Sequence, residues 1–351
     1  MTAWITAQRA GEVLRDLADT PAPSQVAAWT RGPVVERFLR DWRVPQGAWA
    51  ANFRGTGNGV LRIGSGARRP VWILAHWDAI SFLIGGRAGE AYALVPFHHH
   101  VMTEEGSQPG AAVRYDSEAR SYGVIARGTI TGGERPTFRS DDPFVLGAGD
   151  RVVYDTPSRP LDDDRLEGQL DNAAGCAAAL LATAFLARLA DVEVVTCFVD
   201  EEEGPVALGN TAFARGSPRL LHHLPHPDVA IVVDHHTCET VETAPLGRGA
   251  LIREYASHAR GAVTPPWLYA SLRRLAQEHA DHLTLHEDAR AEANRSDCVI
   301  MMQVTPNVIL CGPPVVGRHY QSGPYVCSAF DVAHVARSLV TMAMRFQPAT
   351  A

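Results

Sequence analysis

Four apolar segments of the sequence each end at side chains of the types that bind metal ions. In open α/β sheets, ligands bind outside the carboxyl ends of the strands, so four such endings in one chain predict a shared site. Histidine nitrogens and carboxylate oxygens are the donors that Zn²⁺ and similar ions use in catalytic sites. The endings are His76 and Asp78 after VWILA, Asp200 to Glu203 after VVTCFV, Asp234 to His236 after VAIVV, and His319 in the segment after VILCG.

Each of these residue types has a part in metal-assisted hydrolysis. Two metal ions roughly 3.5–4 Å apart can share a hydroxide and polarise a carbonyl group. Asp78, two residues after His76, can accept the second imidazole N–H and so fix the tautomer. Of the neighbours Glu201 and Glu202, one can bind a metal while the other acts as general base. Asp171, where an alanine-rich segment begins, supplies a further carboxylate.

These assignments have structural alternatives. The acidic run 200–203 could be a solvated cluster, although its place directly after an apolar strand favours a functional role. Asp171 could merely cap the helix that follows it. At the third ending Asp234 is the preferred ligand, and His235 or His236 could bind instead.

The composition excludes several kinds of chemistry. All 32 basic residues among the 351 are arginine, which excludes Schiff-base aldolases, pyridoxal-phosphate enzymes and phosphate sites built on lysine. Arginine stays charged, so base catalysis must come from His, Asp or Glu. The net charge is −7 and the arginines are scattered, so nucleic acid is not expected as a partner.

The sequence also predicts where the protein resides. None of its six cysteines forms a CxxC pair, which is typical of reduced core residues in a cytosolic protein. The first residues lack the pattern of a signal peptide, and no apolar run approaches the roughly 20 residues that span a bilayer. We therefore expect a cytoplasmic protein with no membrane partner.

The elements that must position the site alternate between strands and helices, which predicts an α/β fold with a doubly wound, mostly parallel sheet. The expected strands are short apolar runs typical of strands covered on both faces. They lie within 71–76, 192–204, 228–236 and 307–312, and helices are expected at 4–18, 33–42, 171–190, 265–280 and 329–344.

Residues 82–160 have a different composition, rich in Gly, Thr, Tyr and Arg with short alternating pieces. This predicts a small β-barrel-like domain, a lid or oligomerisation module, inserted into a catalytic domain made of 1–81 and 161–351. Within it, the run 98–100 (HHH) could bind metal, but adjacent residues of an extended chain alternate faces, so a solvent or lid position is preferred.

At the candidate metal-binding residues, the sequence resembles the co-catalytic di-zinc aminopeptidases of the glutamyl/deblocking (tetrahedral) type, which are zinc exopeptidases. The resemblance covers nearly the whole chain, and its pieces occur in the order of the family. They are GNGVLRIGSG, LAHWDAISFLI, LGAGDRVVYD, EGQLDNAAGCAAALL, VTCFVDEEEGPVALGN, AIVVDHH, NRSDC and the last His loop.

The resemblance implies two divalent metal ions, with zinc preferred over cobalt or manganese. It implies His76, Asp171 and Asp234 on one metal, and Asp171, Glu202 and His319 on the other, with Asp171 bridging. It also implies Glu201 as general base and Asp78 as the residue that orients His76, and it suggests oligomers built through the inserted domain.

The last ligand departs from the family pattern. The family shows Arg-Tyr-x-His-Ser, whereas residues 317–322 here are GRHYQS. Counting back from Ser322 places Gln321 at the ligand position, and counting forward from Pro306 places His319 within one residue of it. We prefer His319, because Gln is a poor zinc ligand.

The bridging position departs as well. The family's Arg after the Asp-Asp/Asn pair is Ala173 here. A second segment, LDDDRLEG, imitates the motif with Asp163 or Asp164, but no long helix follows it, so Asp171 is preferred.

Together these features predict a two-metal hydrolase of amide bonds, most simply an aminopeptidase acting on peptides or small amides. Asp297 and Arg318 are its predicted substrate-binding residues. The alternatives are an amidohydrolase for N-acyl amino acids or a specialised metabolite, and a metal-depleted binding protein without catalytic activity.

Overall fold

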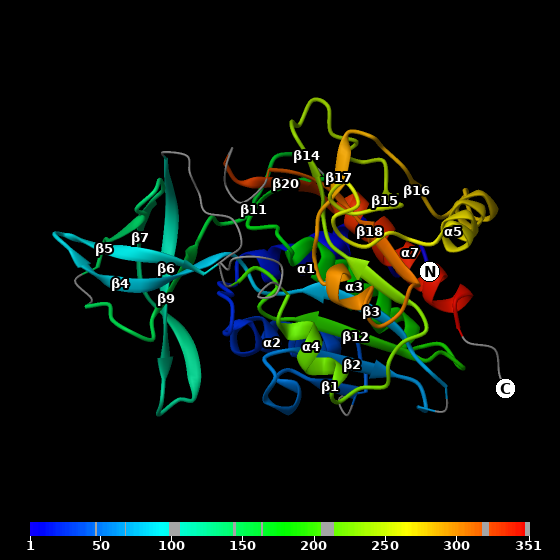
Figure 1. The fold of residues 1–351 in the computed structure, drawn as a ribbon, viewed down its shortest axis with the longest axis horizontal. Coiled ribbons are helices and arrows are strands. Elements are labelled where there is room, and N and C mark those ends of the chain that lie inside the picture. Colours follow the sequence, from blue (N-terminus) through cyan, green and yellow to red (C-terminus); the bar gives the residue numbers. More distant parts are fainter. Residues whose placement is uncertain are drawn as a thin grey trace.

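The computed structural model describes residues 1–45, 48–66, 68–97, 106–142, 145–162, 164–204, 214–317 and 323–347. A mixed eight-stranded sheet forms the centre of the larger part of the protein (Figure 1). Its strands, in spatial order, are β1 (Trp49–Ala50), β2 (Gly59–Ile63), β12 (Val194–Val199), β3 (Val71–His76), β13 (Ala230–Val233), β18 (Val308–Gly312), β15 (Ala250–Arg253) and β16 (Leu285–His286).

The four central strands of this sheet, β12, β3, β13 and β18, are mutually parallel. On their two sides β2 and β15 join antiparallel. Every residue of the central strands is buried, as expected of a sheet covered on both faces. The predicted doubly wound, mostly parallel α/β sheet is therefore confirmed, with antiparallel strands added beyond its centre.

Helices cover both faces of the sheet. Three of them, α1 (Ala7–Ala18), α3 (Ala173–Leu186) and α7 (Ala329–Arg345), pack against one another on one face, where Ile73 and Ala75 of β3 join the same core. Alternate residues of β3, Trp72 and Leu74, belong to the core of the other face, which α4 (Gly216–Leu221) and α6 (Cys298–Met301) cover. Further helices in the described part of the chain are α2 (Ala27–Asp41), the 3₁₀ turn η2 (Phe53–Gly55) and α5 (Pro266–Glu278).

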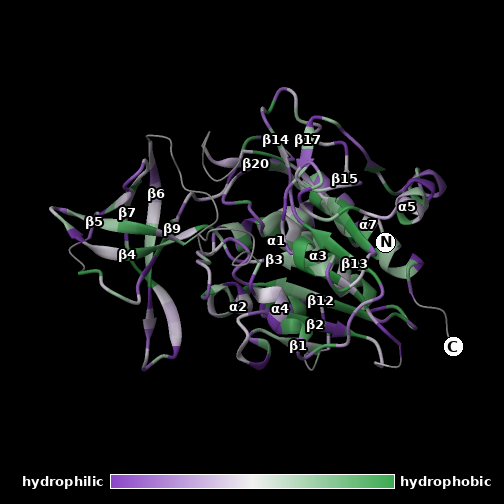
Figure 2. Cartoon of the chain, in the orientation of Figure 1, coloured by the Kyte–Doolittle hydropathy of each residue, from purple (hydrophilic) through white to green (hydrophobic). Residues whose placement is uncertain are grey.

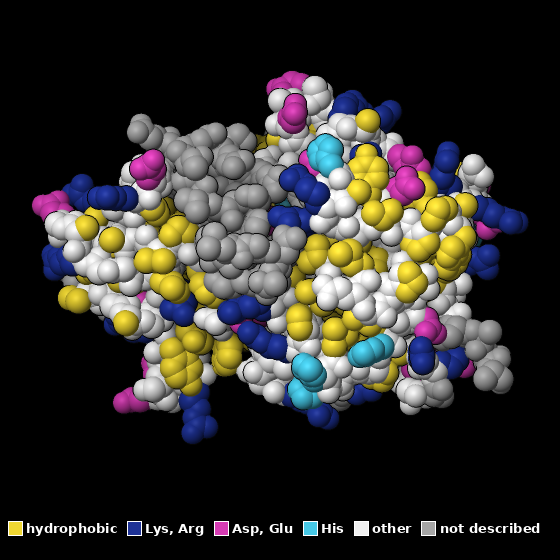
Figure 3. Space-filling view, viewed as in Figure 1, with side chains coloured by type: hydrophobic (Ala, Val, Ile, Leu, Met, Phe, Trp, Pro, Cys, Tyr) yellow, Lys and Arg dark blue, Asp and Glu magenta, His cyan; other side chains and the backbone are white. Residues whose placement is uncertain are grey.

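Figure 2 shows the most hydrophobic residues in the central strands and in α3. All but one of the residues of α3 are buried. Its many alanine side chains are small, which allows the helix to pack closely against its neighbours. On the face shown in Figure 3, arginine, acidic and hydrophobic side chains are interspersed. All six cysteines are buried and unpaired. Among the described residues, no helix combines the length and apolar character needed to cross a membrane.

A second, six-stranded sheet continues from the first. Its order is β10 (Arg159–Pro160), β11 (Arg165–Gly168), β20 (Tyr325–Ser328), β19 (Pro314–Val316), β14 (His236–Cys238) and β17 (Ala291–Ala293). The chain passes from the first sheet to the second at two places: β13 leads into β14, and β18 leads into β19. Asp234 and His235 lie at the first of these junctions.

A closed six-stranded barrel occupies the chain between the ends of β3 and β10 and forms the part at the left of Figure 1. Its order is β4 (Ser81–Ala88), β5 (Ala91–Phe97), β8 (Thr137–Ser140), β7 (Ser121–Thr131), β6 (Ser107–Asp116) and β9 (Arg151–Tyr154). Closure leaves the barrel without free sheet edges. The predicted inserted β barrel is confirmed. The histidine run 98–100 lies outside the described residues.

Candidate metal centre

The chain brings its chemistry-bearing residues together where β3, β12 and β13 end. His76 is the last residue of β3, Asp234 follows β13 directly, and Glu202 lies in the turn after β12. These strands are parallel neighbours, so their carboxyl ends meet at the same edge. Asp171 joins them from the turn before α3, and all four side chains are buried.

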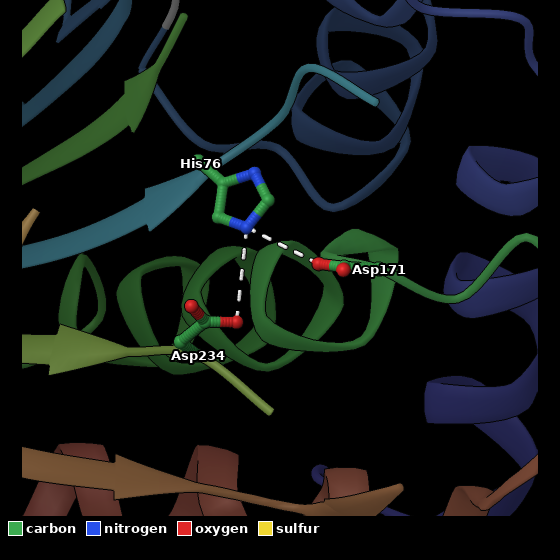
Figure 4. A group of neighbouring side chains, drawn as sticks. All are labelled: His76, Asp171 and Asp234. Carbon is green, nitrogen blue, oxygen red and sulfur yellow. Dashed lines mark ion pairs between the residues drawn. The ribbon is translucent and has the colours of Figure 1, made fainter. Parts of the chain in front are cut away.

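One imidazole nitrogen faces three carboxylates. Nε2 of His76 lies 3.2 Å from Oδ1 of Asp171 and 3.7 Å from Oδ1 of Asp234 (Figure 4). The same nitrogen is 4.0 Å from Oε2 of Glu202. Residues from four separate parts of the chain therefore point their donor atoms at one small volume.

The other imidazole nitrogen of His76 is held by Asp78. Nδ1 lies 3.2 Å from the carbonyl oxygen of Asp78 and 3.6 Å from its Oδ1. The Asp78 carboxylate accepts the backbone N–H of Glu202 (3.1 Å) and of Glu203 (3.3 Å) and the hydroxyl of Ser24 (2.6 Å). Asp78 thus joins the end of β3 to the glutamate turn, and a proton on Nδ1 leaves the Nε2 lone pair available to a metal.

A buried arginine fixes the backbone that follows His76. Arg31 of α2 is fully buried, and its Nη1 donates to the carbonyl oxygen of Trp77 at 2.6 Å. Its Nε donates to the carbonyl oxygen of Leu17 at 3.0 Å. The backbone between His76 and Asp78 is therefore tied to α2 and to the end of α1.

The three consecutive glutamates point to different partners. Glu201 has a left-handed backbone (φ 55°), and both of its carboxylate oxygens are engaged by arginines, Oε2 by Arg215 and Oε1 by Arg219 at 2.6 Å. Glu202 and Glu203 instead lie with His76, their ligand atoms within 4.8 Å of one another and of an imidazole nitrogen. The structure thus brings Glu203 to the cluster and leaves the Glu201 carboxylate outside it.

A second histidine joins the site from the residue after Asp234. The buried Nδ1 of His235 lies 3.1 Å from Oδ1 of Asp234 and 3.3 Å from Oδ1 of Asp171. His236, the other alternative in the sequence, is also buried but belongs to β14. Burial lowers the pKa of His236 to about 3, which keeps this imidazole neutral.

The carboxylates crowd one another. Burial, reinforced by neighbouring acidic groups, raises the pKa of Glu202 and of Glu203 well above the usual carboxyl range. Burial opposes the charged form of His76, but Glu202 and Asp171 outweigh it and raise its pKa. The same balance, dominated by Asp171, raises the pKa of His235 to about 10. These shifts have one physical cause: crowded, buried carboxylates are stabilised by a positive charge close to them.

The donor set fits a divalent metal. Two groups of three side chains have donor atoms mutually within 4.8 Å, namely His76 with Asp171 and Asp234, and His76 with Glu202 and Glu203. Imidazole nitrogen with carboxylate oxygen is the set that zinc takes in catalytic sites, and cobalt and manganese accept it as well. The excess of buried carboxylates supplies the reason for a cation to bind.

The remaining predicted residues are placed as follows. Asp297 is fully buried at the start of α6, its Oδ1 accepts the Ser217 hydroxyl at 2.5 Å, and burial raises its pKa to about 7. Asp164 is exposed in the turn before β11 and takes no part in the cluster. Four further residues of the sequence analysis lie outside the described part of the chain: Asp163, Arg318, His319 and Gln321.

Gly312 sets how closely β13 and β18 approach at the site. A Cβ at this position would lie 1.7 Å from the carbonyl oxygen of Asp234, so no side chain fits there without moving the backbone. The strands pair in register up to Val233 and Cys311, and Asp234 and Gly312 are the next residue of each strand. The close approach at Gly312 therefore determines the position of Asp234.

We expect Gly312→Ala to weaken Zn²⁺ binding at this cluster by at least about tenfold and to lower the free energy of unfolding by about 1–3 kcal/mol. The added methyl group must push Asp234 away from His76, and a displaced ligand weakens a metal site. The matched control is Gly123→Ala in β7, where a Cβ meets nothing within 4 Å. Urea denaturation and competition with a chromophoric chelator measure the two effects, and equal behaviour of the two variants would contradict this account of Gly312.

No protein-family model and no curated protein sequence matches the chain. Solved structures do match over nearly its full length. A TET aminopeptidase from a marine-sediment archaeon of the Thaumarchaeota superposes with a TM-score of 0.76 and 14% identity, covering 97% of each chain. An aminopeptidase from the archaeon Desulfurococcus kamchatkensis gives a TM-score of 0.73 and 17% identity over 97% of this chain and 96% of that one.

A third similar structure is the TET1 peptidase of Pyrococcus horikoshii, which can assemble into a tetrahedron or a large octahedral shell. Its TM-score is 0.69 at 16% identity, over 95% of this chain and 99% of the other. Identities this low establish the fold and leave the activity to the site. The protein therefore has the fold of the TET aminopeptidases, as the resemblance in its sequence predicts.

Proposed function

We propose that the protein is a metal-dependent hydrolase of amide bonds, and specifically an aminopeptidase that removes N-terminal residues from peptides. The observation that carries the proposal is the convergence of His76, Asp171 and Asp234 at the carboxyl edge of the sheet. It occurs in a chain whose fold is shared with aminopeptidases.

The proposal includes two divalent metals, zinc in preference to cobalt or manganese. His76, Asp171 and Asp234 would hold one of them, and the described geometry supports this set most directly. Asp171, Glu202 and His319 would hold the other. When bound, such ions polarise a carbonyl group and make a water molecule more acidic.

The chain's own groups would then position the substrate and move its protons. With a metal bound at Nε2, Asp78 would hold the remaining proton of His76 on Nδ1. A glutamate takes a proton from the attacking water and returns it to the leaving amine. Asp297 is suited to the positively charged amino group of a peptide, and Arg318 to a negatively charged substrate group.

Two of the three consecutive glutamates compete for the role of general base. The sequence motif predicts Glu201, whose two oxygens the structure pairs with Arg215 and Arg219. Glu203 already lies with Glu202 and His76. We favour Glu203, because its carboxylate already lies beside His76 and Glu202, whereas both oxygens of Glu201 face arginines.

We also propose that the chain forms a homo-oligomer. The support is the assembly of a similarly folded peptidase into a tetrahedron or an octahedral shell. The inserted barrel is the module proposed to make the contacts.

A panel of matched substrates tests the activity. Aminoacyl anilides with a free amine and the same compounds N-acetylated would be incubated with metal-loaded protein. An aminopeptidase cleaves only the free-amine series, whereas cleavage restricted to the acylated series would assign the site to an N-acyl amidohydrolase. Absence of hydrolysis together with absence of bound metal would favour the binding-protein alternative.

A further inference from the structure

We infer that His235 is a further metal ligand, which completes a set of two nitrogens and two oxygens with His76, Asp171 and Asp234. This inference rests on the proposed function only in requiring that a metal binds at the site. The sequence treats His235 as an alternative to Asp234, whereas the structure places both side chains at the same point.

The distances fit four protein ligands around one zinc ion, and water would then bind as a fifth ligand, to which a catalytic zinc can expand. Nε2 of His76 lies 3.2 and 3.7 Å from the Oδ1 atoms of Asp171 and Asp234, and Nδ1 of His235 lies 3.3 and 3.1 Å from the same two oxygens. Ligands 2.0–2.2 Å from a zinc ion at tetrahedral angles are separated by about 3.3–3.6 Å. All four nitrogen–oxygen separations therefore fall close to the edges of a zinc tetrahedron.

The orientation of the ring favours coordination over a simple hydrogen bond. Nδ1 of His235 is buried and lies 3.3 and 3.1 Å from two carboxylate oxygens, but it is not aligned on either of them as a well-directed N–H donor. A protonated imidazole locked as an ion-pair partner would be expected to aim its N–H along one N–H···O line. A nitrogen facing the space between two oxygens is placed as one ligand among several.

The surroundings hold the ring in this orientation. Nε2 of His235 lies 3.2 Å from Oγ1 of Thr237, and that oxygen accepts a hydrogen bond from Nδ2 of Asn294 at 2.6 Å. Tyr325 packs edge-to-face against the ring, with centroids 6.0 Å apart, and its hydroxyl donates to Oδ2 of Asp171 at 3.3 Å. A metal-binding His characteristically has its second nitrogen engaged in this way.

The main test is direct observation of the metal. Crystals of the full chain loaded with Zn²⁺ would be measured at the zinc absorption edge. We expect a zinc peak about 2.0–2.1 Å from both His76 Nε2 and His235 Nδ1. A peak ligated by His76, Asp171 and Asp234 with His235 beyond 3 Å would overturn the inference and leave the proposed function standing. A chain that takes up no zinc would overturn both.

A titration in solution provides a second readout that does not depend on activity. Zn²⁺ affinity would be measured by competition with a chromophoric chelator for His235→Phe and for the matched neighbour variant His236→Phe. We expect the first substitution to weaken binding at least about 100-fold, since it removes a ligand rather than an outer contact, and the second to change it less than about threefold. Equal affinities of the two variants would contradict the assignment, and the crystal measurement needs no variant to fold.

Discussion

Asp171→Asn should eliminate metal binding at the first site and reduce kcat/KM on a free-amine substrate at least about 1,000-fold. The carboxylate is the point on which the site converges, since Oδ1 lies within 3.3 Å of nitrogens of both His76 and His235. Its other oxygen accepts the hydroxyl of Tyr325. Loss of outer contacts to a metal site typically costs 10–100-fold, and loss of a shared ligand should cost more.

The control for this variant is Asp164→Asn. Asp164 belongs to the segment that imitates the bridging motif, and it is exposed in the turn before β11. The Asp164→Asn variant should keep metal content and turnover within about twofold of the unmodified protein and should leave its thermal stability unchanged. If Asp171→Asn still bound a full complement of metal, or if Asp164→Asn were the variant that lost it, the assignment of the site would be wrong.

Glu203→Gln should retain bound metal and lower kcat about 100- to 10,000-fold, the range typical of a general acid–base group. The amide keeps the shape of the side chain and removes the proton acceptor. The matched variant Glu201→Gln should lower kcat by less than about tenfold, because the structure uses both of its oxygens on Arg215 and Arg219. Single-turnover kinetics with parallel metal analysis would measure both.

The reverse outcome is equally informative. A loss of kcat confined to Glu201→Gln would return the role of general base to Glu201, as the sequence motif predicts. It would require the carboxylate to leave its two arginines when substrate binds. An equal and large loss in both variants would show that the structure does not separate their roles, and would contradict the preference for Glu203.

The strand-end residues could be predicted because burial itself marks them. A short apolar run that stops abruptly at polar residues marks the end of a buried strand, and His76 and Asp234 lie directly at such ends. Parallel pairing of β3 with β13 then brings the two residues to the same edge. This explains how the composition of isolated segments can predict a three-dimensional cluster.

The glutamate turn could not be predicted in the same way. Three consecutive carboxylates carry no periodic pattern that separates them, and the left-handed backbone of Glu201 sends its side chain to the arginines around α4. Asp78 then fixes the next two residues through their backbone N–H groups. Arg215 and Arg219 gave no signal in the sequence, because their partner is determined by this turn.

The second sheet was missed for a related reason, and His235 was expected only as an alternative to Asp234. Strands β14 and β19 are three residues each, too short to show alternation, and they pair with segments distant in the sequence. An extended chain through Asp234 and His235 would place their side chains on opposite faces. The chain instead leaves β13 at Val233 and enters β14 at His236, and within this junction the His235 ring lies against the carboxylates of both Asp234 and Asp171.

The central claim is that the buried cluster around His76 is a metal centre that hydrolyses amide bonds. Its most direct test is a joint titration of metal content and activity on one preparation. Protein stripped with a chelator should lose hydrolysis of a free-amine peptide substrate, and activity should return in proportion to the Zn²⁺, Co²⁺ or Mn²⁺ bound per chain. Full activity in the stripped protein, or far less than one metal per chain after reconstitution, would contradict it.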